Sequence, residues 1–330
     1  MNSSINTYNL QHQPSPHISS NKKSQMIMLH VLIALCFPAV AAVYFFGFRA
    51  MLMIAVGMFT SVLFEYLYQL IRKKTVTVND GSAAVTGMLL GLSLPTTAPI
   101  WTLVLGTGFA IVVVKQLSGG IGRNLFNPAV SARVMLKIFF TPWITNWVLP
   151  GHDAISTATP LEHIGHFARS VPAEIPSLMD LFLGIDLGGN AGETSKLMIF
   201  VGMIYLIVAK VITPKIPVIY ISTVAFIMLV YSGFDLHFMG AHALSGTLFF
   251  AAVFMATDYS SGALTPKGQI FFALGCGVLT SLFRIVFNFP GGVGFSIIIM
   301  NMLAPWIDKQ CTPRIYGHKK AIKVRGDREM

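Results

Sequence analysis

The sequence predicts an all-α polytopic membrane protein, with about ten transmembrane helices arranged as two inverted five-helix repeats. The first observation is composition: of 330 residues, 54% are hydrophobic and only 11% are charged, whereas soluble domains contain about 25% charged residues. The second is that apolar residues gather in runs approaching the roughly 20 residues that a membrane-spanning helix needs. The third is a short glycine motif that occurs once in each half of the chain.

The apolar runs predict the spans in chain order. They lie at 27–47, 50–71, 81–95, 99–117, 127–147, 194–212, 216–233, 241–257, 268–287 and 292–308. The third and eighth of these runs are short and contain glycine. Such interrupted segments are expected inside a helix bundle, away from lipid.

Lysine and arginine residues predict the orientation, because short cytoplasmic loops carry an excess of both. With the N-terminus inside, only Arg49, Arg169 and Lys196 fall on the outer side of the membrane. We therefore expect both termini to be cytoplasmic. The net charge of +10 is explained by this distribution, and no nucleic-acid partner is expected.

The spans divide the chain into five parts. We expect a disordered cytoplasmic tail at 1–25, a first five-helix repeat at 26–148, an extracytoplasmic loop at 149–193, a second repeat at 194–308 and a basic cytoplasmic tail at 309–330.

The glycine motif supports the repeat. "GGIGRNLF" at 119–126 recurs as "GGVGFSII" at 291–298, in each case before the last span of its unit. Five spans per unit is an odd number, so the two units are predicted to be inverted, with one motif cytoplasmic and one outside. Glycines allow backbone to approach a flat ligand closely; a tight turn or a helix contact is the alternative. The candidate ligand-binding glycines are Gly119, Gly120 and Gly122 inside, and Gly291, Gly292 and Gly294 outside.

Ionisable residues at membrane depth are candidates for an ion path, because their burial is costly and each needs a partner. Glu65 lies within the second predicted span, Asp80 opens the third, and Asp258 closes the eighth. Arg133, Lys137 and Arg284 lie close to or inside spans, where interfacial or structural pairing is the alternative. Three scattered cysteines without CxxC spacing predict no metal or iron–sulfur site.

The stretch "DAISTATP" at 153–160 lies in the predicted outer loop. It resembles the D-x-x-[S/T]-G-A-[T/S] signal of a flavin transferase, which joins FMN through its phosphate to the last hydroxyl residue. That resemblance assigns covalent FMN to Thr159, with Asp153, Ser156 and Ala158 as recognition residues. Pro160 favours an extended Thr159. Thr157 stands where the pattern has glycine.

Longer motifs point to a family. They are "NDGSAAVTGMLLGLSLP" (79–95), "GGIGRNLFNPA" (119–129), "STATPL" (156–161), "DLFLG" (180–184), "GGNAGETS" (188–195), "ATDYSSGALTPKG" (256–268) and "MNMLAPWIDKQCTPRIYGH" (300–318). In these the chain resembles the D subunits of Rnf ferredoxin:NAD oxidoreductase complexes. It is more distantly similar to the B subunit of sodium-translocating NADH:quinone reductases.

The resemblance implies a urea-transporter-like inverted repeat in the inner membrane of a prokaryote. It implies covalent FMN on the outer side and non-covalent riboflavin near the cytoplasmic side, the latter at Gly119–Asn127 with Asn124 and Asn127 as donors and Asp258 nearby. It also implies partners: an FMN-bearing extracytoplasmic G subunit, the A and E membrane subunits, the flavin transferase and membrane lipid.

The expected function is electron relay through these flavins, coupled to Na⁺ or H⁺ transport. The chain shows no NAD fingerprint, no cluster cysteines and no catalytic residues of its own, so it is expected to be a component of the enzyme. The alternatives are a small-solute channel or transporter of the same fold, the quinone-reductase B subunit, and a scaffold subunit without flavin.

Overall fold

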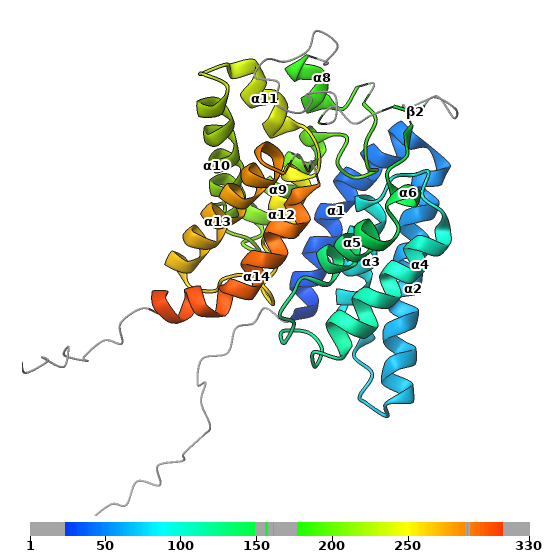
Figure 1. Cartoon of the computed structure of the whole chain (residues 1–330). Helices are drawn as coiled ribbons and strands as arrows, with labels where there is room; N and C mark the ends of the chain where they lie inside the picture. Colours follow the sequence, from blue (N-terminus) through cyan, green and yellow to red (C-terminus); the bar gives the residue numbers. More distant parts are fainter. Residues whose placement is uncertain are drawn as a thin grey trace, which may run out of the picture.

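The computed structural model describes residues 24–148, 156–157, 161, 177–185, 187–287, 289 and 291–312. Over these residues the chain is helical, apart from one antiparallel pair of two-residue strands. Figure 1 shows the start of α1 and the end of α14 toward one end of the molecule, and α8 and α11 toward the other. The predicted all-α class is confirmed at this level.

The first half of the chain contains the elements α1 to α6. Their bounds are α1 Ser24–Phe46, α2 Phe48–Ile71, the 3₁₀ turn η1 Val78–Asp80, α3 Ser82–Ser93, α4 Ile100–Gly108, the π-helical stretch η2 Phe109–Gln116, α5 Pro128–Phe139 and α6 Thr141–Ile144. Gly47 separates α1 from α2 with a φ of 65°, a conformation that glycine adopts without steric cost.

The described elements between the halves lie toward the end of the molecule away from the start of α1 (Figure 1). Strand β1 (Trp147–Val148) pairs with β2 (Ser156–Thr157), and the short helix α8 spans Leu178–Leu183. Ser177 caps α8 by accepting a hydrogen bond from the Asp180 N–H, as N-cap serines do.

The second half contains α9 Lys196–Val208, α10 Lys215–Tyr231, α11 Leu236–Leu244, α12 Leu248–Phe254, α13 Pro266–Ile285 and α14 Gly292–Cys311. Helices α11 and α12 meet at an angle of 55°. The break includes Gly246, whose φ is +70°, so the interruption predicted in the eighth span is a real change of helix direction.

Three helices among the described residues, α1, α2 and α13, are long and apolar enough to cross a membrane, and the bent pair α11–α12 makes a fourth. Each of the ten predicted spans coincides at least in part with a helix. The span predicted at 127–147 is wrong in its extent: α5 ends at Phe139 and the separate α6 follows. Pro142 lies in the first turn of α6, and a proline cannot continue the preceding helix.

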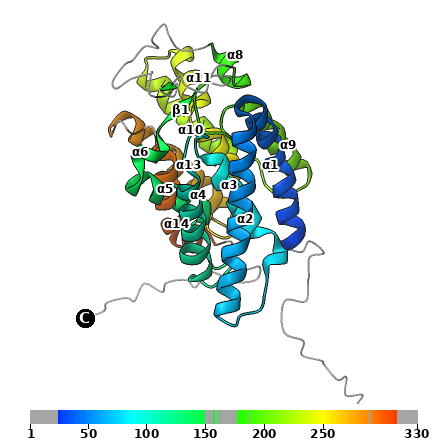
Figure 2. The ribbon, with the colours of Figure 1, turned by 90° about the vertical axis from the view of Figure 1, so that its right-hand side faces the viewer.

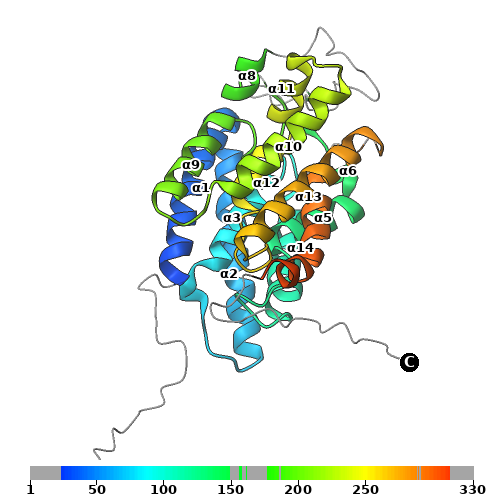
Figure 3. The same ribbon diagram turned by 90° about the vertical axis from the view of Figure 1, so that its left-hand side faces the viewer.

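Two pairs of helices join the halves of the chain. The first long helices of the halves, α1 and α9, lie side by side, as Figures 2 and 3 show. Helices α5 and α14, which lie in the fifth and tenth predicted spans, also contact each other. Within the halves, α2 packs on α3 and α4, while α10 packs on α11, α12 and α13. The larger buried core draws on both halves.

Candidate functional site

A buried ion pair lies between α2 and η2. The Lys115 Nζ atom is 2.7 Å from the Glu65 Oε2 atom, and the two side chains are 2% and 1% exposed. Lys115 belongs to a π-helical stretch. This conformation is rare in proteins overall, and where it occurs it is often at a functional site. The partner expected for Glu65 at membrane depth is therefore a lysine from the same half of the chain.

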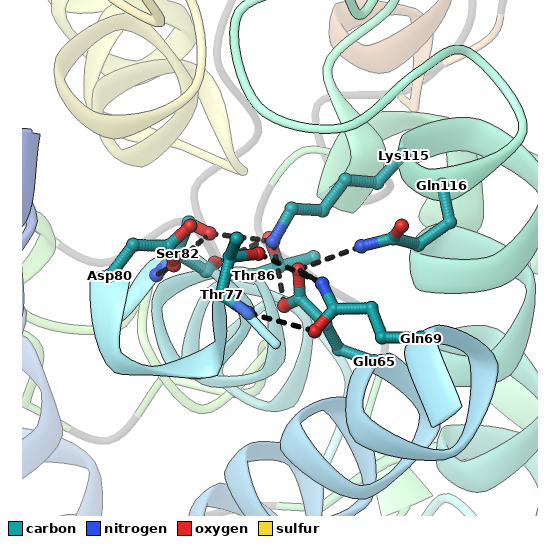
Figure 4. A network of polar contacts seen from close by, with 8 residues as sticks. All are labelled: Glu65, Gln69, Thr77, Asp80, Ser82, Thr86, Lys115 and Gln116. Carbon is teal, nitrogen blue, oxygen red and sulfur yellow. Dashed lines mark hydrogen bonds and ion pairs between the residues drawn. The ribbon is translucent and has the colours of Figure 1, made fainter. Parts of the chain in front are cut away.

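Hydrogen bonds extend this pair into a network (Figure 4). The Glu65 Oε1 atom accepts from the Gln116 side chain at 2.8 Å and from the Gln69 side chain at 3.3 Å. The Lys115 Nζ atom also donates to the Ser82 Oγ atom at 2.5 Å, and Ser82 in turn donates to Asp80 at 2.5 Å. One ammonium group thus links two carboxylates, directly to Glu65 and through Ser82 to Asp80.

Lys115 and Ser82 also form part of the wall of a cleft between the two halves of the chain. The cleft is open on one side and has a cavity volume of about 80 Å³. One wall comes from the start of α1 and from α3; the others come from η2, the loop before α5, the α9–α10 connection and the segment after α12. The polar lining residues are Ser82, Thr86, Lys115, Asn124, Asn127, Thr257, Asp258, Tyr259 and Ser260.

Asn127 holds one side of the cleft together. Its Oδ1 atom accepts hydrogen bonds from the Ala129 and Val130 N–H groups and caps α5, while its Nδ2 atom donates to the Met255 carbonyl at 3.0 Å. Asn124 is also buried; with its amide nitrogen turned inward it donates to the Gly120 carbonyl at 3.0 Å and the Lys115 carbonyl at 3.3 Å. Both predicted donors therefore line the cleft and already brace its backbone.

Replacing Asn127 with alanine is expected to lower the free energy of unfolding by about 2 kcal/mol, because the cap and the tie to Met255 are both lost. Asn127→Asp keeps the capping acceptor but cannot donate to the Met255 carbonyl, so about half of the loss should return. Thermal unfolding in detergent measures the stability of both variants. An alanine variant as stable as the parent would show that Asn127 braces nothing.

Asp258 faces the same cleft from the other half of the chain. Its carboxylate accepts from the Ser260 and Ser261 hydroxyl groups at 2.9 and 2.8 Å. The neighbouring Tyr259 also lines the cleft; partial burial raises the pKa of its phenol above the usual range, so this group stays a neutral hydrogen-bond donor. The cleft brings together Asn124, Asn127 and Asp258, three of the residues assigned from the sequence.

The two glycine motifs differ in structure. Gly119, Gly120 and Gly122 have φ values of +109°, +91° and +81°, so this loop needs glycine for its backbone. Gly292 and Gly294 instead lie in the first turn of α14. A Cβ atom on Gly292 would lie 2.3 Å from the Phe283 Cβ atom, and one on Gly294 would lie 2.9 Å from the Val134 Cγ2 atom. The atoms nearest a Cβ atom on Gly291 belong to the flexible Lys137 side chain, which can move aside. The second motif is thus a close helix contact.

Two arginines that do not line the cleft form structural contacts elsewhere. Arg133 lies 3.9 Å from the Glu193 carboxylate. Arg284 donates to the His242 carbonyl at 2.6 Å, in the last turn of α11, where a cation satisfies unpaired carbonyl groups. These contacts agree with structural pairing for both arginines.

The predicted FMN attachment segment falls largely outside the described residues. Asp153, Ala158 and Thr159 are among those left undescribed. The backbone of Ser156 and Thr157 forms strand β2, and the side chain of Leu161 is buried.

Sequence reasoning missed Lys115, Gln69 and Gln116. The available signal was "VVVKQL" at 112–117, in which a charged and an amide residue follow an apolar run directly. A lysine at that position is commonly explained by snorkelling to the membrane interface. Its burial comes from α2, whose Glu65 lies 50 positions earlier in the chain.

Comparison with known proteins identifies relatives over nearly the whole chain. Residues 11–317 match the model of the NQR2, RnfD, RnfE family. The chain is 39% identical to the D subunit of the Na⁺-translocating ferredoxin:NAD⁺ oxidoreductase complex of Acetobacterium woodii, covering 97% of this chain and 99% of that protein. It is 37% identical to the D subunit of the proton-translocating ferredoxin:NAD⁺ oxidoreductase complex of Clostridium ljungdahlii, covering 93% and 96%. It is 34% identical to the D subunit of the ion-translocating oxidoreductase complex of Yersinia enterocolitica, covering 94% and 99%.

Proposed function

The chain belongs to the NQR2, RnfD, RnfE family, and from that premise we propose that it relays electrons through two flavins in an ion-translocating ferredoxin:NAD⁺ oxidoreductase complex. It is a subunit of such an oxidoreductase complex, since relatives along its whole length are D subunits. The observation that carries the electron-relay proposal is the "DAISTATP" segment, which resembles a flavin-attachment signal and has no use in a solute channel.

The first flavin is FMN, joined through its phosphate to the Thr159 hydroxyl. Two features support this assignment. The loop is proposed to lie outside the cytoplasm, where the transferase works, and the transferase needs an exposed, extended acceptor. Strand β2 ends at Thr157, two residues before the acceptor. Gly291, Gly292 and Gly294 were assigned to this flavin; their close contacts with α5 and α13 favour a packing role instead.

Replacing Thr159 with alanine is expected to abolish covalent flavin. The protein is co-expressed with the flavin transferase, denatured, run on a gel and viewed under ultraviolet light. Wild type and Thr159→Ser should fluoresce, because both carry the hydroxyl that forms the phosphoester, and Thr159→Ala should be dark. A dark wild-type band, or an alanine band as bright as wild type, would contradict the assignment. Thr157→Gly restores the full signal and should be at least as bright as wild type.

The second flavin is riboflavin, held without a covalent bond in the cleft. The lining suits such a group: the polar residues Ser82, Thr86, Asn124 and Asn127 share it with apolar side chains from α1 and the α9–α10 connection. The hydroxyl groups of Ser82 and Thr86 already donate, to Asp80 and to the Ser82 carbonyl, and can still accept a hydrogen bond from a ligand. A flat ring needs apolar walls and a few polar groups at its edge. When bound, the flavin supplies the redox chemistry; the protein supplies hydrogen bonds, the Lys115 charge and exclusion of water.

Glu65, Asp80 and Asp258 are the proposed carboxylates of the ion path. Glu65 and Asp80 belong to one network, and Asp258 faces the same cleft as Lys115. Glu65 is buried, and Asp80 and Asp258 are partly exposed. Ionisable residues at membrane depth mark cation and proton paths in membrane proteins. The transported ion is a monovalent cation, Na⁺ or H⁺; the relatives named above include one of each.

The architecture we propose is ten spans in two inverted five-helix repeats, with both termini cytoplasmic in the inner membrane. The supporting pattern is that α1 contacts α9 and α5 contacts α14. The first predicted span of each half thus meets its counterpart, and so does the fifth. Exposed apolar side chains on α1, α2 and α13, among them Val40, Phe59 and Phe271, are suited to lipid or to the other membrane subunits.

A further inference from the structure

Lys115 belongs to two structures at once. Its ammonium group donates to the Glu65 Oε2 atom and to the Ser82 Oγ atom, and its side chain lines the cleft. Among the described residues of the cleft wall, Lys115 and Asp258 are the charged ones. A change of charge in the cleft therefore acts directly on Lys115.

The two oxygen atoms of Glu65 are held differently. The Oε1 atom accepts from the uncharged side chains of Gln116 and Gln69, while the Oε2 atom accepts from Lys115. A lysine ammonium sits on a flexible four-carbon stem with three rotatable donors. When it turns toward the cleft, the Oε2 atom and the Ser82 Oγ atom lose the cation that they share, while the amides keep the carboxylate in position.

We propose that Lys115 couples the charge of the ligand in the cleft to the availability of Glu65 for a transported cation. This rests on the proposed function, in which the cleft holds a flavin. Each electron that reaches the ring from the ferredoxin side of the complex adds one negative charge unless a proton follows it. The added charge draws Lys115 from Glu65, whose freed oxygen takes Na⁺ or a proton. By linkage, a cation at Glu65 equally favours the reduced flavin.

The carboxylates around Lys115 agree with this arrangement. Asp80 is held by the N–H and hydroxyl groups of Ser82 at 2.8 and 2.5 Å, and Asp258 is held by two serine hydroxyl groups. Glu65 is the carboxylate that an ammonium group neutralises directly. It is thus the one whose charge becomes available when Lys115 moves.

The test is a redox titration of the non-covalent flavin in the purified complex, whose content is first measured by extraction after denaturation. Lys115→Met should favour the oxidised flavin and Glu65→Gln the reduced flavin, each by at least tenfold, which is about 30 mV for a two-electron couple. The double variant should return close to wild type, because it removes a pair with no net charge. Lys115→Arg keeps the charge and should stay near wild type.

Cation dependence gives a second readout. The midpoint potential of the wild-type flavin should change when the Na⁺ concentration or the pH is changed. This change should be absent in Glu65→Gln. Lys196→Met is the matched control: Lys196 is a buried lysine that donates to the Glu193 carbonyl, and its removal should leave the midpoint unchanged.

Each result of the titration either supports or overturns the proposal. If Lys115→Met and Glu65→Gln shift the flavin midpoint potential in the same direction, or not at all, the proposed role of Lys115 is wrong. The proposal that the cleft holds a flavin is not affected by that result. A wild-type complex that releases no flavin overturns the proposed cleft flavin and this inference together. If the Lys115→Met complex does not assemble, Glu65→Gln still tests the inference. A higher flavin midpoint potential supports it, and an unchanged midpoint potential overturns it.

Discussion

Replacing Glu65 with leucine is expected to lower the free energy of unfolding by about 3–5 kcal/mol, the range for removing one partner of a buried ion pair. The Lys115 ammonium, 2% exposed in the native protein, is left without its carboxylate. Gln116 and Gln69 lose their shared acceptor at the same time. Lys115→Met should cost less, because Glu65 keeps both amide donors and can take up a proton.

The double variant Glu65→Leu/Lys115→Met distinguishes ion pairing from general damage. An apolar pair of similar volume is often as stable as the buried ion pair that it replaces, so the double variant should be more stable than Glu65→Leu alone. Thermal unfolding of the four proteins in detergent gives the coupling energy directly. Additive losses in the double variant would show that the two side chains do not stabilise each other.

Local pattern was enough to predict where the helices lie. The apolar runs that predicted the spans coincide with helices because hydrophobicity is read residue by residue. The ends were harder to predict. The span at 127–147 was drawn through Phe140, where the chain changes from α5 to α6. The eighth was started at 241, although α11 begins at Leu236.

The candidate site was predicted only in its parts. The motifs predict Asn124, Asn127 and Asp258 as site residues, and in the structure all three line one cleft. Asn127 and Asp258 lie more than a hundred positions apart, and no spacing in the sequence shows that they meet. Lys115 was not predicted because its burial depends on the packing of α2 against η2.

The cleft and the network share one helix, α3. Ser82 at its first residue contacts both Asp80 and Lys115, and Thr86 one turn later lines the cleft. The position of α3 against α2 therefore sets where Ser82 lies relative to Glu65, and it also sets the shape of the cleft. Small residues fix that position, and their replacement should disturb stability and site together.

Replacing Gly87 with valine is expected to lower the free energy of unfolding by about 3 kcal/mol, at the upper end of overpacking effects. A Cβ atom on Gly87 would lie 2.1 Å from the Gly57 carbonyl oxygen and 2.6 Å from the Ser61 Oγ atom. Four residues on, a Cβ atom on Gly91 would lie 2.9 Å from the Met53 carbonyl oxygen. Small residues at four-residue spacing let two membrane helices approach closely, and here the obstacle is backbone, which cannot move aside.

Gly108→Ala is the matched control for Gly87→Val. Gly108 is also helical, but its added Cβ atom would be 3.4 Å from the Phe64 ring, an ordinary contact, and alanine favours helix by up to about 1 kcal/mol over glycine. The control should therefore be as stable as wild type or slightly more stable. Because α3 carries Ser82 and Thr86, Gly87→Val should also release the non-covalent flavin at a lower temperature than wild type does, while covalent FMN on Thr159 is unaffected. A valine variant with wild-type unfolding would mean that α2 and α3 are not held together at Gly57 and Gly87.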